Sequence, residues 1–157
     1  MRFFTREWWS GDGNPKVVTA YRRHFSSIRH RLPAELVALH ERYSLHDGHV
    51  RSFSASDAHR KLRVVIDTWD NANVYRCLAL EYGRVTSLHL SGADKSDIAN
   101  PPSWGDLGYH EVDIADGQLE HRMLFAGDLE LHVRFGSFDL VVEVGPAIQD
   151  SNTSRSG

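Results

Sequence analysis

The stretch from Leu107 to Val144 constrains the fold of this chain most strongly, because apolar and polar residues alternate along it between turn signals. A period of two is typical of β-strands, whose successive side chains point to opposite faces of a sheet. Three turn signals, Asp116-Gly117, Ala126-Gly127-Asp128 and Gly136-Ser137, divide the stretch into four segments. We therefore predict a four-stranded antiparallel meander.

The first two turns predict the register of the first three strands. A two-residue type I′ turn at Asp116-Gly117 needs positive φ at both positions, and it places Val112 opposite His121. A three-residue loop after the second strand places Met123 opposite Leu131. A two-residue loop would shift the register by one and turn every apolar side chain to the wrong face.

The third turn predicts that the last strand folds back on the strand before it. A type II′ turn at Gly136-Ser137 would place Phe135 opposite Phe138 and Val133 opposite Leu140. The apolar face of the whole meander would then consist of Val112, Ile114, Leu119, Met123, Phe125, Leu129, Leu131, Val133, Phe135, Phe138, Leu140, Val142 and Val144.

The opposite face of the predicted meander is polar. It carries Glu111, Asp113, Glu120, Arg122, Glu130, His132, Arg134, Asp139 and Glu143. A sheet with one face on the core and one in water gives this alternation, so we interpret the charged neighbours as surface pairs. If this face serves recognition, its binding residues would be Glu111, Arg122, His132 and Arg134.

Two amphipathic helices precede the strands. Asn14-Pro15 is a helix start, with Asn as the N-cap and Pro at the first helical position. Apolar residues then recur at helical spacing, and Pro33 separates the two helices. The two stripes consist of Val17, Tyr21, Phe25, Ile28 and Leu32, and of Leu32, Leu36, Leu39 and Tyr43.

These patterns together predict an α+β fold with two N-terminal amphipathic helices packed on a mainly antiparallel, meander-type β-sheet of about seven or eight strands. Residues 1–145 would form a single domain, and residues 146–157 a disordered polar tail. Residues 91–106, with Pro101-Pro102, form the longest stretch for which we predict no regular structure.

Composition excludes several classes of protein. The 157 residues carry a net charge of −3 without a basic block, which argues against nucleic acid as a partner. No apolar run has membrane-spanning length, and the first residues lack a secretory pattern. The single cysteine, Cys77, allows no internal disulfide. We expect a cytoplasmic protein.

Histidine clusters suggest a metal site. His46-Asp47-Gly48-His49 could hold zinc or another divalent ion, and His121, with His110 diagonal to it, could join if the sheet curls. The structural alternative is that Asp47 caps a turn, Gly48 takes positive φ and His121 is a hydrogen-bonded core residue. The absence of a nucleophile elbow or phosphate loop favours a protein that is not an enzyme.

Several motifs in order resemble a known family. They are the opening Met1-Arg-Phe-Phe-Thr-Arg-Glu-Trp-Trp, the Leu-Pro-x-x-Leu-x-x-Leu helix from Leu32, the Leu45-His46-Asp47 corner and the strand pattern of residues 109–135. This order resembles the bacterial domain-of-unknown-function family DUF4085 over nearly the whole chain to Val144. A basic-aromatic linker before the first helix is shorter here.

The resemblance implies an α+β fold and a bacterial cytoplasmic setting. The family has no established activity, so no catalytic residue is transferred. The polar positions that match its pattern are Glu111, His121, His46 and Asp47.

The leading functional hypothesis is a non-enzymatic protein-binding module, such as a toxin-immunity or accessory protein that binds a basic toxin or effector through complementary charge. One alternative is a metal-binding protein or metal-dependent hydrolase that uses His46, Asp47, His49 and His121. Another is a small-molecule-binding domain with its site between helices and sheet, lined by Trp8, Trp9, Trp69 and Trp104.

Overall fold

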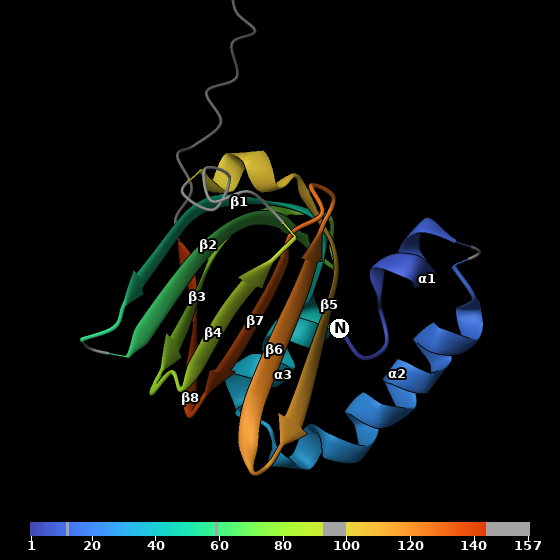
Figure 1. Ribbon diagram of the computed structural model, residues 1–157, viewed down its shortest axis with the longest axis horizontal. Coiled ribbons are helices and arrows are strands. Elements are labelled where there is room, and N and C mark those ends of the chain that lie inside the picture. Colours follow the sequence, from blue (N-terminus) through green and yellow to red (C-terminus); the bar gives the residue numbers. More distant parts are fainter. Residues whose placement is uncertain (12, 59, 93–99, 144–157) are drawn as a thin grey trace, which may run out of the picture.

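The chain forms an α+β fold in which helices precede an eight-stranded antiparallel sheet (Figure 1). The computed structural model describes residues 1–11, 13–58, 60–92 and 100–143. The helical elements are α1 (Arg6–Ser10), α2 (Pro15–Ile28), the 3-10 turn η1 (Arg29–Arg31), α3 (Ala34–Arg42) and the 3-10 turn η2 (Pro101–Trp104). The strands are β1 (Tyr43–Ser56), β2 (Lys61–Asp70), β3 (Tyr75–Gly83), β4 (Ser87–Ser91), β5 (Asp106–Ala115), β6 (Gln118–Phe125), β7 (Glu130–Phe135) and β8 (Ser137–Glu143).

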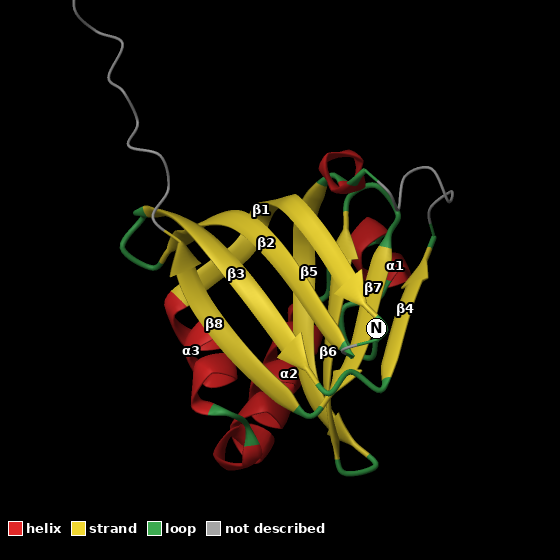
Figure 2. Ribbon diagram, turned by 90° about the vertical axis from the view of Figure 1, so that its left-hand side faces the viewer, coloured by secondary structure: helices red, strands yellow, loops and turns green. Residues whose placement is uncertain are grey.

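The sheet is strongly curved, and its strands follow the order β4-β7-β6-β5-β1-β2-β3-β8. Helix α3 lies inside the curve, whereas α2 lies beside β5 (Figure 1). None of the helices that the structure describes covers the outer face of β1, β2, β3 and β8 (Figure 2). The core therefore lies between the inner face of the sheet and the helices.

The two predicted helices form for the predicted reasons. The Asn14 side chain accepts the N–H of Lys16 at 2.9 Å, and Pro15 opens α2. Both apolar stripes face the sheet, since Tyr21, Phe25 and Leu36 are all buried. Burial of these faces, more than helix propensity, holds such short helices in place.

The meander has the predicted register through its first three strands. Val112 lies opposite His121 across β5 and β6, and Met123 lies opposite Leu131 across β6 and β7. The first turn has positive φ at Asp116, 52°, as a type I′ hairpin requires.

The predicted place of the last strand is wrong. β8 pairs with β3 at the other end of the sheet, so that Phe138 lies opposite Tyr82 and Leu140 opposite Leu80. The β7 edge where β8 was expected is occupied by β4, with Leu88 opposite Val133. The alternation of apolar and polar residues predicts which side chains of a strand face the core, but it does not predict which strand lies next to it. The curvature of this sheet brings a second apolar edge, that of β3, within reach of β8.

The expectation of a water-facing polar side is also wrong for much of the meander. Glu111, Asp113 and Glu120 are only 1%, 5% and 0% exposed. The segment Met1–Phe4 covers Glu111, whose carboxylate accepts the backbone N–H groups of Arg2, Phe3 and Phe4. A buried carboxylate needs such donors, so the first residues are part of the folded domain.

Residues 91–106 are more ordered than expected where the structure describes them. Pro101–Trp104 forms η2, and Trp104 is buried against the rings of Phe53 and Phe125. The predicted tail at 146–157 lies outside the described residues. Among the helices that the structure does describe, none is long and apolar enough to cross a bilayer.

Candidate functional site

A cleft opens where two neighbouring strands of the sheet separate. β1 and β5 pair only at Gly48 with Leu107 and at His49 with Asp106. Beyond these pairs, the N–H of Val112 donates to the Tyr21 hydroxyl of α2 at 2.8 Å instead of to a strand. The side chain of His46 spans the opening and contacts the carbonyl of Gly108. The divergence leaves a wedge between β1, β5 and the helices.

The wedge is a cleft of about 430 Å³. This volume falls within the range of roughly 300–1,000 Å³ that is usual for small-molecule sites. Seven of its twelve lining residues carry an aromatic or imidazole ring. The lining residues are Phe4, Val18, Tyr21, Arg22, His40, Tyr43, Ser44, Leu45, His46, Gly108, Tyr109 and His110.

A chain of hydrogen bonds runs from the cleft into the core. His110 lines the cleft, and its Nδ1 lies 3.0 Å from Nε2 of His121. Nδ1 of His121 lies 2.8 Å from the hydroxyl of Tyr82, and both of these residues are buried. The protons of this chain are therefore isolated from water behind His110.

Burial keeps all three groups of this chain uncharged. It lowers the pKa of His121 to about 3, and with help from the nearby His121 and His40 it lowers the pKa of His110 well below its usual value. Burial also raises the pKa of Tyr82 well above its usual value. A neutral imidazole has one N–H and one acceptor nitrogen, so the chain must have a definite direction.

That direction follows from Tyr82. Among the described residues its hydroxyl has no hydrogen-bond partner but His121. If it accepted from His121, its own O–H would be buried without an acceptor, at a cost of about 1–3 kcal/mol, so we infer that Tyr82 donates to Nδ1 of His121. His121 then carries its proton on Nε2 and donates to Nδ1 of His110. His110 in turn carries its proton on Nε2, on the side of the ring away from His121.

A second imidazole at the cleft, His40, contains an unpaired polar atom. Its ring packs on Phe25 and Tyr21 and lies 5.4 Å, centre to centre, from the ring of His110. Its Nδ1 is buried and has no hydrogen-bond partner among the described residues. Burial lowers the pKa of His40, which keeps the ring neutral. Such unpaired atoms are uncommon in folded proteins and call for an explanation.

The four predicted metal ligands do not converge. His46 contacts Gly108 and lies 3.6 Å from Asp47, whereas His49 forms a separate pair with Asp106 at 2.7 Å. His121 is in the core. No group of three or more potential ligands in the described part of the chain has a geometry that could hold a metal ion.

The sequence around these histidines belongs to a bulged strand. Tyr43–Ser56 is continuous β-structure with a register shift between Ser44 and His49. Positive φ occurs at Asp47, at 60°, and not at Gly48 as predicted. Gly48 is needed for close packing instead, since a Cβ there would lie 3.0 Å from Cγ2 of Ile66.

The four residues of the predicted binding face form an ion network. Arg122 contacts both Glu111, at 3.2 Å, and the buried Glu120. Arg134 and His132 contact Glu120 from the next strand, at 2.5 and 3.4 Å. Their charges are therefore directed largely at one another.

The predicted tryptophan-lined groove is not formed by tryptophans. Trp104 is in the core, and Trp69 is 47% exposed on the outer side. Trp8 and Trp9 pack on Tyr109 and support the wall of the cleft from behind. Tyrosine and histidine rings line the site between helices and sheet instead.

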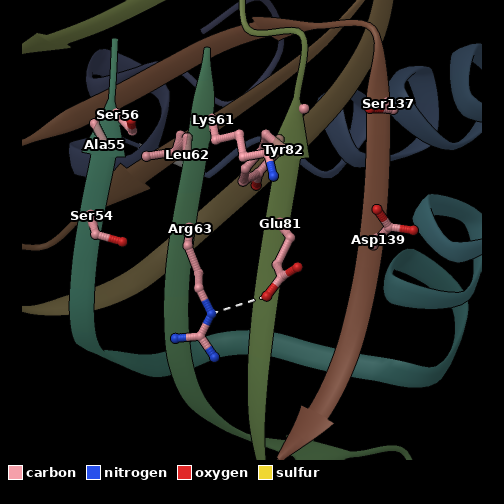
Figure 3. A pocket seen from close by; sticks show the side chains of 11 residues that line it. Ser54, Ala55, Ser56, Lys61, Leu62, Arg63, Glu81, Tyr82, Ser137 and Asp139 are labelled. Carbon is pink, nitrogen blue, oxygen red and sulfur yellow. Dashed lines mark hydrogen bonds and ion pairs between the residues drawn. The ribbon is translucent and has the colours of Figure 1, made fainter. Parts of the chain in front are cut away.

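A second hollow lies on the outer face of the sheet, across β1, β2, β3 and β8 (Figure 3). It has about 450 Å³, and a polar row of Ser54, Arg63, Glu81 and Asp139 crosses it. Arg63 is already paired with Glu81 at 3.1 Å and with Glu143. The charges of Arg63 and Glu81 in this outer groove are therefore already paired with each other.

Comparison with known proteins adds no identification. No protein-family model and no curated protein matches this chain. The resemblance to the DUF4085 family accordingly stays a prediction from the sequence.

Proposed function

We propose that this protein binds a small molecule in the cleft between β1, β5 and the helices. The observation that carries the proposal is that neutral imidazoles meet at a ring-lined hollow, while one of them, His40, has a buried nitrogen for which the described residues provide no hydrogen-bond partner. A purely structural histidine would normally have its ring nitrogens satisfied. Apolar walls with a few fixed polar groups are typical of ligand sites.

The cleft is suited to binding rather than to proton-transfer catalysis. A general base needs a pKa near the working pH. Burial moves the pKa of His110 and His121 well below that range, and it also lowers the pKa of His40. The same burial makes the hydrogen-bonding pattern constant across the physiological pH range. A constant pattern favours selective recognition of one ligand shape.

A fragment screen followed by NMR of the ¹⁵N-labelled protein tests this function. Binding compounds should shift the amide signals of Gly108 and Tyr109, which line the cleft. Val18→Trp fills the cleft from α2 and should abolish the shifts. Thr19→Trp, at the exposed neighbouring position outside the cleft lining, is the matched control and should preserve them.

The proposal fails if no compound shifts these amides. It also fails if Val18→Trp leaves the shifts intact.

A second candidate function is binding of another protein, and a different observation favours it. The large apolar side chains that the described residues leave exposed are Trp69, Val74, Val141 and Val142. Trp69 at the end of β2 and Val141 of the edge strand β8 lie on the outer face, which no described helix covers (Figure 2). Val74 lies in the turn after β2, and Val142 points to the opposite face of β8. Exposed apolar groups that gather in one region often mark protein interfaces.

A pull-down with wild-type protein and a Trp69→Ser/Val141→Lys variant tests this second function. A stoichiometric partner that the variant no longer retains would support it. Recovery of the same partner by both proteins, or of none by either, would count against it.

A further inference from the structure

We propose that the ligand of the cleft is a small planar monocarboxylate, an inference that rests on the proposed binding function and specifies its substrate class. Three properties of the lining lead to it: one cation at the cleft, a neutral N–H donor beside it, and walls of aromatic rings. Each property selects a different part of the ligand.

The charge of the cleft selects an anion. Arg22 is the one permanently charged residue of the lining, and none of the lining residues is an aspartate or glutamate. Among the described residues no carboxylate pairs with the exposed Arg22 side chain. An arginine in this position can form a two-pronged, charge-assisted interaction with a carboxylate.

The hydrogen-bond chain from the core supplies the donor. With Tyr82 and His121 as donors, the proton of His110 lies on Nε2, the nitrogen that does not face His121, and we assign this N–H of a cleft-lining residue as the donor to the ligand. This N–H needs no charge, so it can donate a hydrogen bond to an oxygen of the ligand at any physiological pH. A hydroxyl or carbonyl oxygen at the end of the ligand away from its carboxylate would suit this position.

The walls select a flat body. Phe4 stacks with Tyr109 at 5.1 Å between ring centres, and Tyr21 and Tyr43 also line the cleft. Aromatic groups pack favourably against each other at centre distances of roughly 4.5–7 Å. A flat, rigid ring packed against this aromatic wall would fill the hollow with little loss of conformational entropy.

Isothermal titration with 4-hydroxybenzoate tests the inference, with 4-hydroxybenzamide as the neutral compound of the same shape. We expect the acid to bind the wild-type protein roughly 10-fold more tightly than the amide, because only the acid forms a charged pair. Arg22→Gln should weaken binding of the acid roughly 10-fold and leave binding of the amide unchanged.

Arg23→Gln is the matched control, since Arg23 is the next residue of α2, is also exposed and is not part of the cleft lining. It should bind the acid as the wild-type protein does. Equal melting temperatures of the two variants would show that both are folded.

The outcomes separate this inference from the proposed function. If acid and amide bind equally and Arg22→Gln changes neither, the carboxylate assignment is overturned while the cleft remains a binding site. If neither compound binds, the assigned ligand class is overturned, and the fragment screen alone then decides the binding function. If the acid binds Val18→Trp as tightly as the wild-type protein, its site is elsewhere and the inference is overturned.

Discussion

Removing the hydroxyl of Tyr82 is the most direct test of the buried hydrogen-bond chain. Tyr82→Phe keeps the ring, which packs on Phe135 and Phe138 at 5.0 and 5.2 Å between ring centres. It removes the donor that lies 2.8 Å from Nδ1 of His121. The substitution therefore separates the hydrogen bond from the packing.

The size of the effect follows from the burial of His121. The side chain is 0% exposed, so the imidazole nitrogen that loses its donor gains no water in exchange. Leaving one buried polar group unpaired costs about 1–3 kcal/mol. For a chain of this size, a loss of about 2 kcal/mol corresponds to a fall in melting temperature of about 4–8 °C.

Urea denaturation measures the loss, and NMR of the imidazole nitrogens measures the direction of the chain. We expect His110 and His121 to carry their protons on Nε2 in the wild-type protein. The control is Tyr75→Phe, whose hydroxyl accepts from Arg51 at 3.2 Å on the exposed side of the sheet. The free energy of unfolding of the Tyr75→Phe variant should fall by less than about 0.5 kcal/mol, as is usual for surface substitutions.

Two results would refute the reasoning. One is a Tyr82→Phe variant as stable as Tyr75→Phe, which would mean that the buried hydrogen bond contributes nothing. The other is a wild-type spectrum with the proton of His121 on Nδ1, which would reverse the chain and remove the donor assigned to His110.

Because the pKa of folded His121 is about 3, the unfolded chain alone takes up this proton below about pH 6.5. His121 should therefore contribute a fall in the free energy of unfolding of up to about 1.4 kcal/mol per pH unit as the pH drops from 6 to 4, and His110 adds a contribution of the same sign. In urea titrations, His121→Gln should remove the His121 contribution from the slope, whereas the control His49→Gln should not. Glu111→Gln should lower the free energy of unfolding by about 3 kcal/mol, because the buried Glu111 carboxylate contacts three backbone N–H groups and Arg122. The control is Glu81→Gln, which breaks a half-exposed pair with Arg63 and should cost less than about 1 kcal/mol. Equal losses for the two variants in urea denaturation would contradict this prediction. Gly48→Ala should lower the free energy of unfolding by about 1–3 kcal/mol, since the added Cβ would lie 2.9 Å from the carbonyl oxygen of Leu45. An unchanged melting curve would contradict this and show that the backbone of the β1 bulge moves to accommodate the Cβ.

Local signals in the sequence predicted local structure well. The Asn14-Pro15 pair marked the start of α2, and Asp116-Gly117 gave the correct register between β5 and β6. Both signals depend on backbone conformations that a few neighbouring residues determine. The α+β class followed because the helical and strand periods occur in separate parts of the chain.

Neighbour relations between distant segments could not be predicted in the same way. The Gly136-Ser137 turn signal suggested a hairpin, yet β8 crosses to β3. The polar side of β5 looked like a surface because nothing local shows that Met1–Phe4 covers Glu111. Both features depend on the curvature of the whole sheet, to which many weak contacts contribute.

The candidate site was predicted only in fragments. His46, His110 and His121 were singled out as histidines that could approach one another, and the structure does place His110 beside His121. Arg22 and Tyr43 were not predicted as site residues, because their positions follow from the separation of β1 and β5. No periodicity in the sequence marks the point where two strands stop pairing.

The exchange of edge strands has a consequence for how the molecule comes apart. β4 follows the first three strands in the chain but pairs with β7, and β8 follows β7 but pairs with β3. Each half of the sheet is thus completed by a strand from the other half, so neither half has its full set of neighbours alone. Because the chain passes from one half to the other to supply each edge strand, we expect the two halves to unfold as a single cooperative unit.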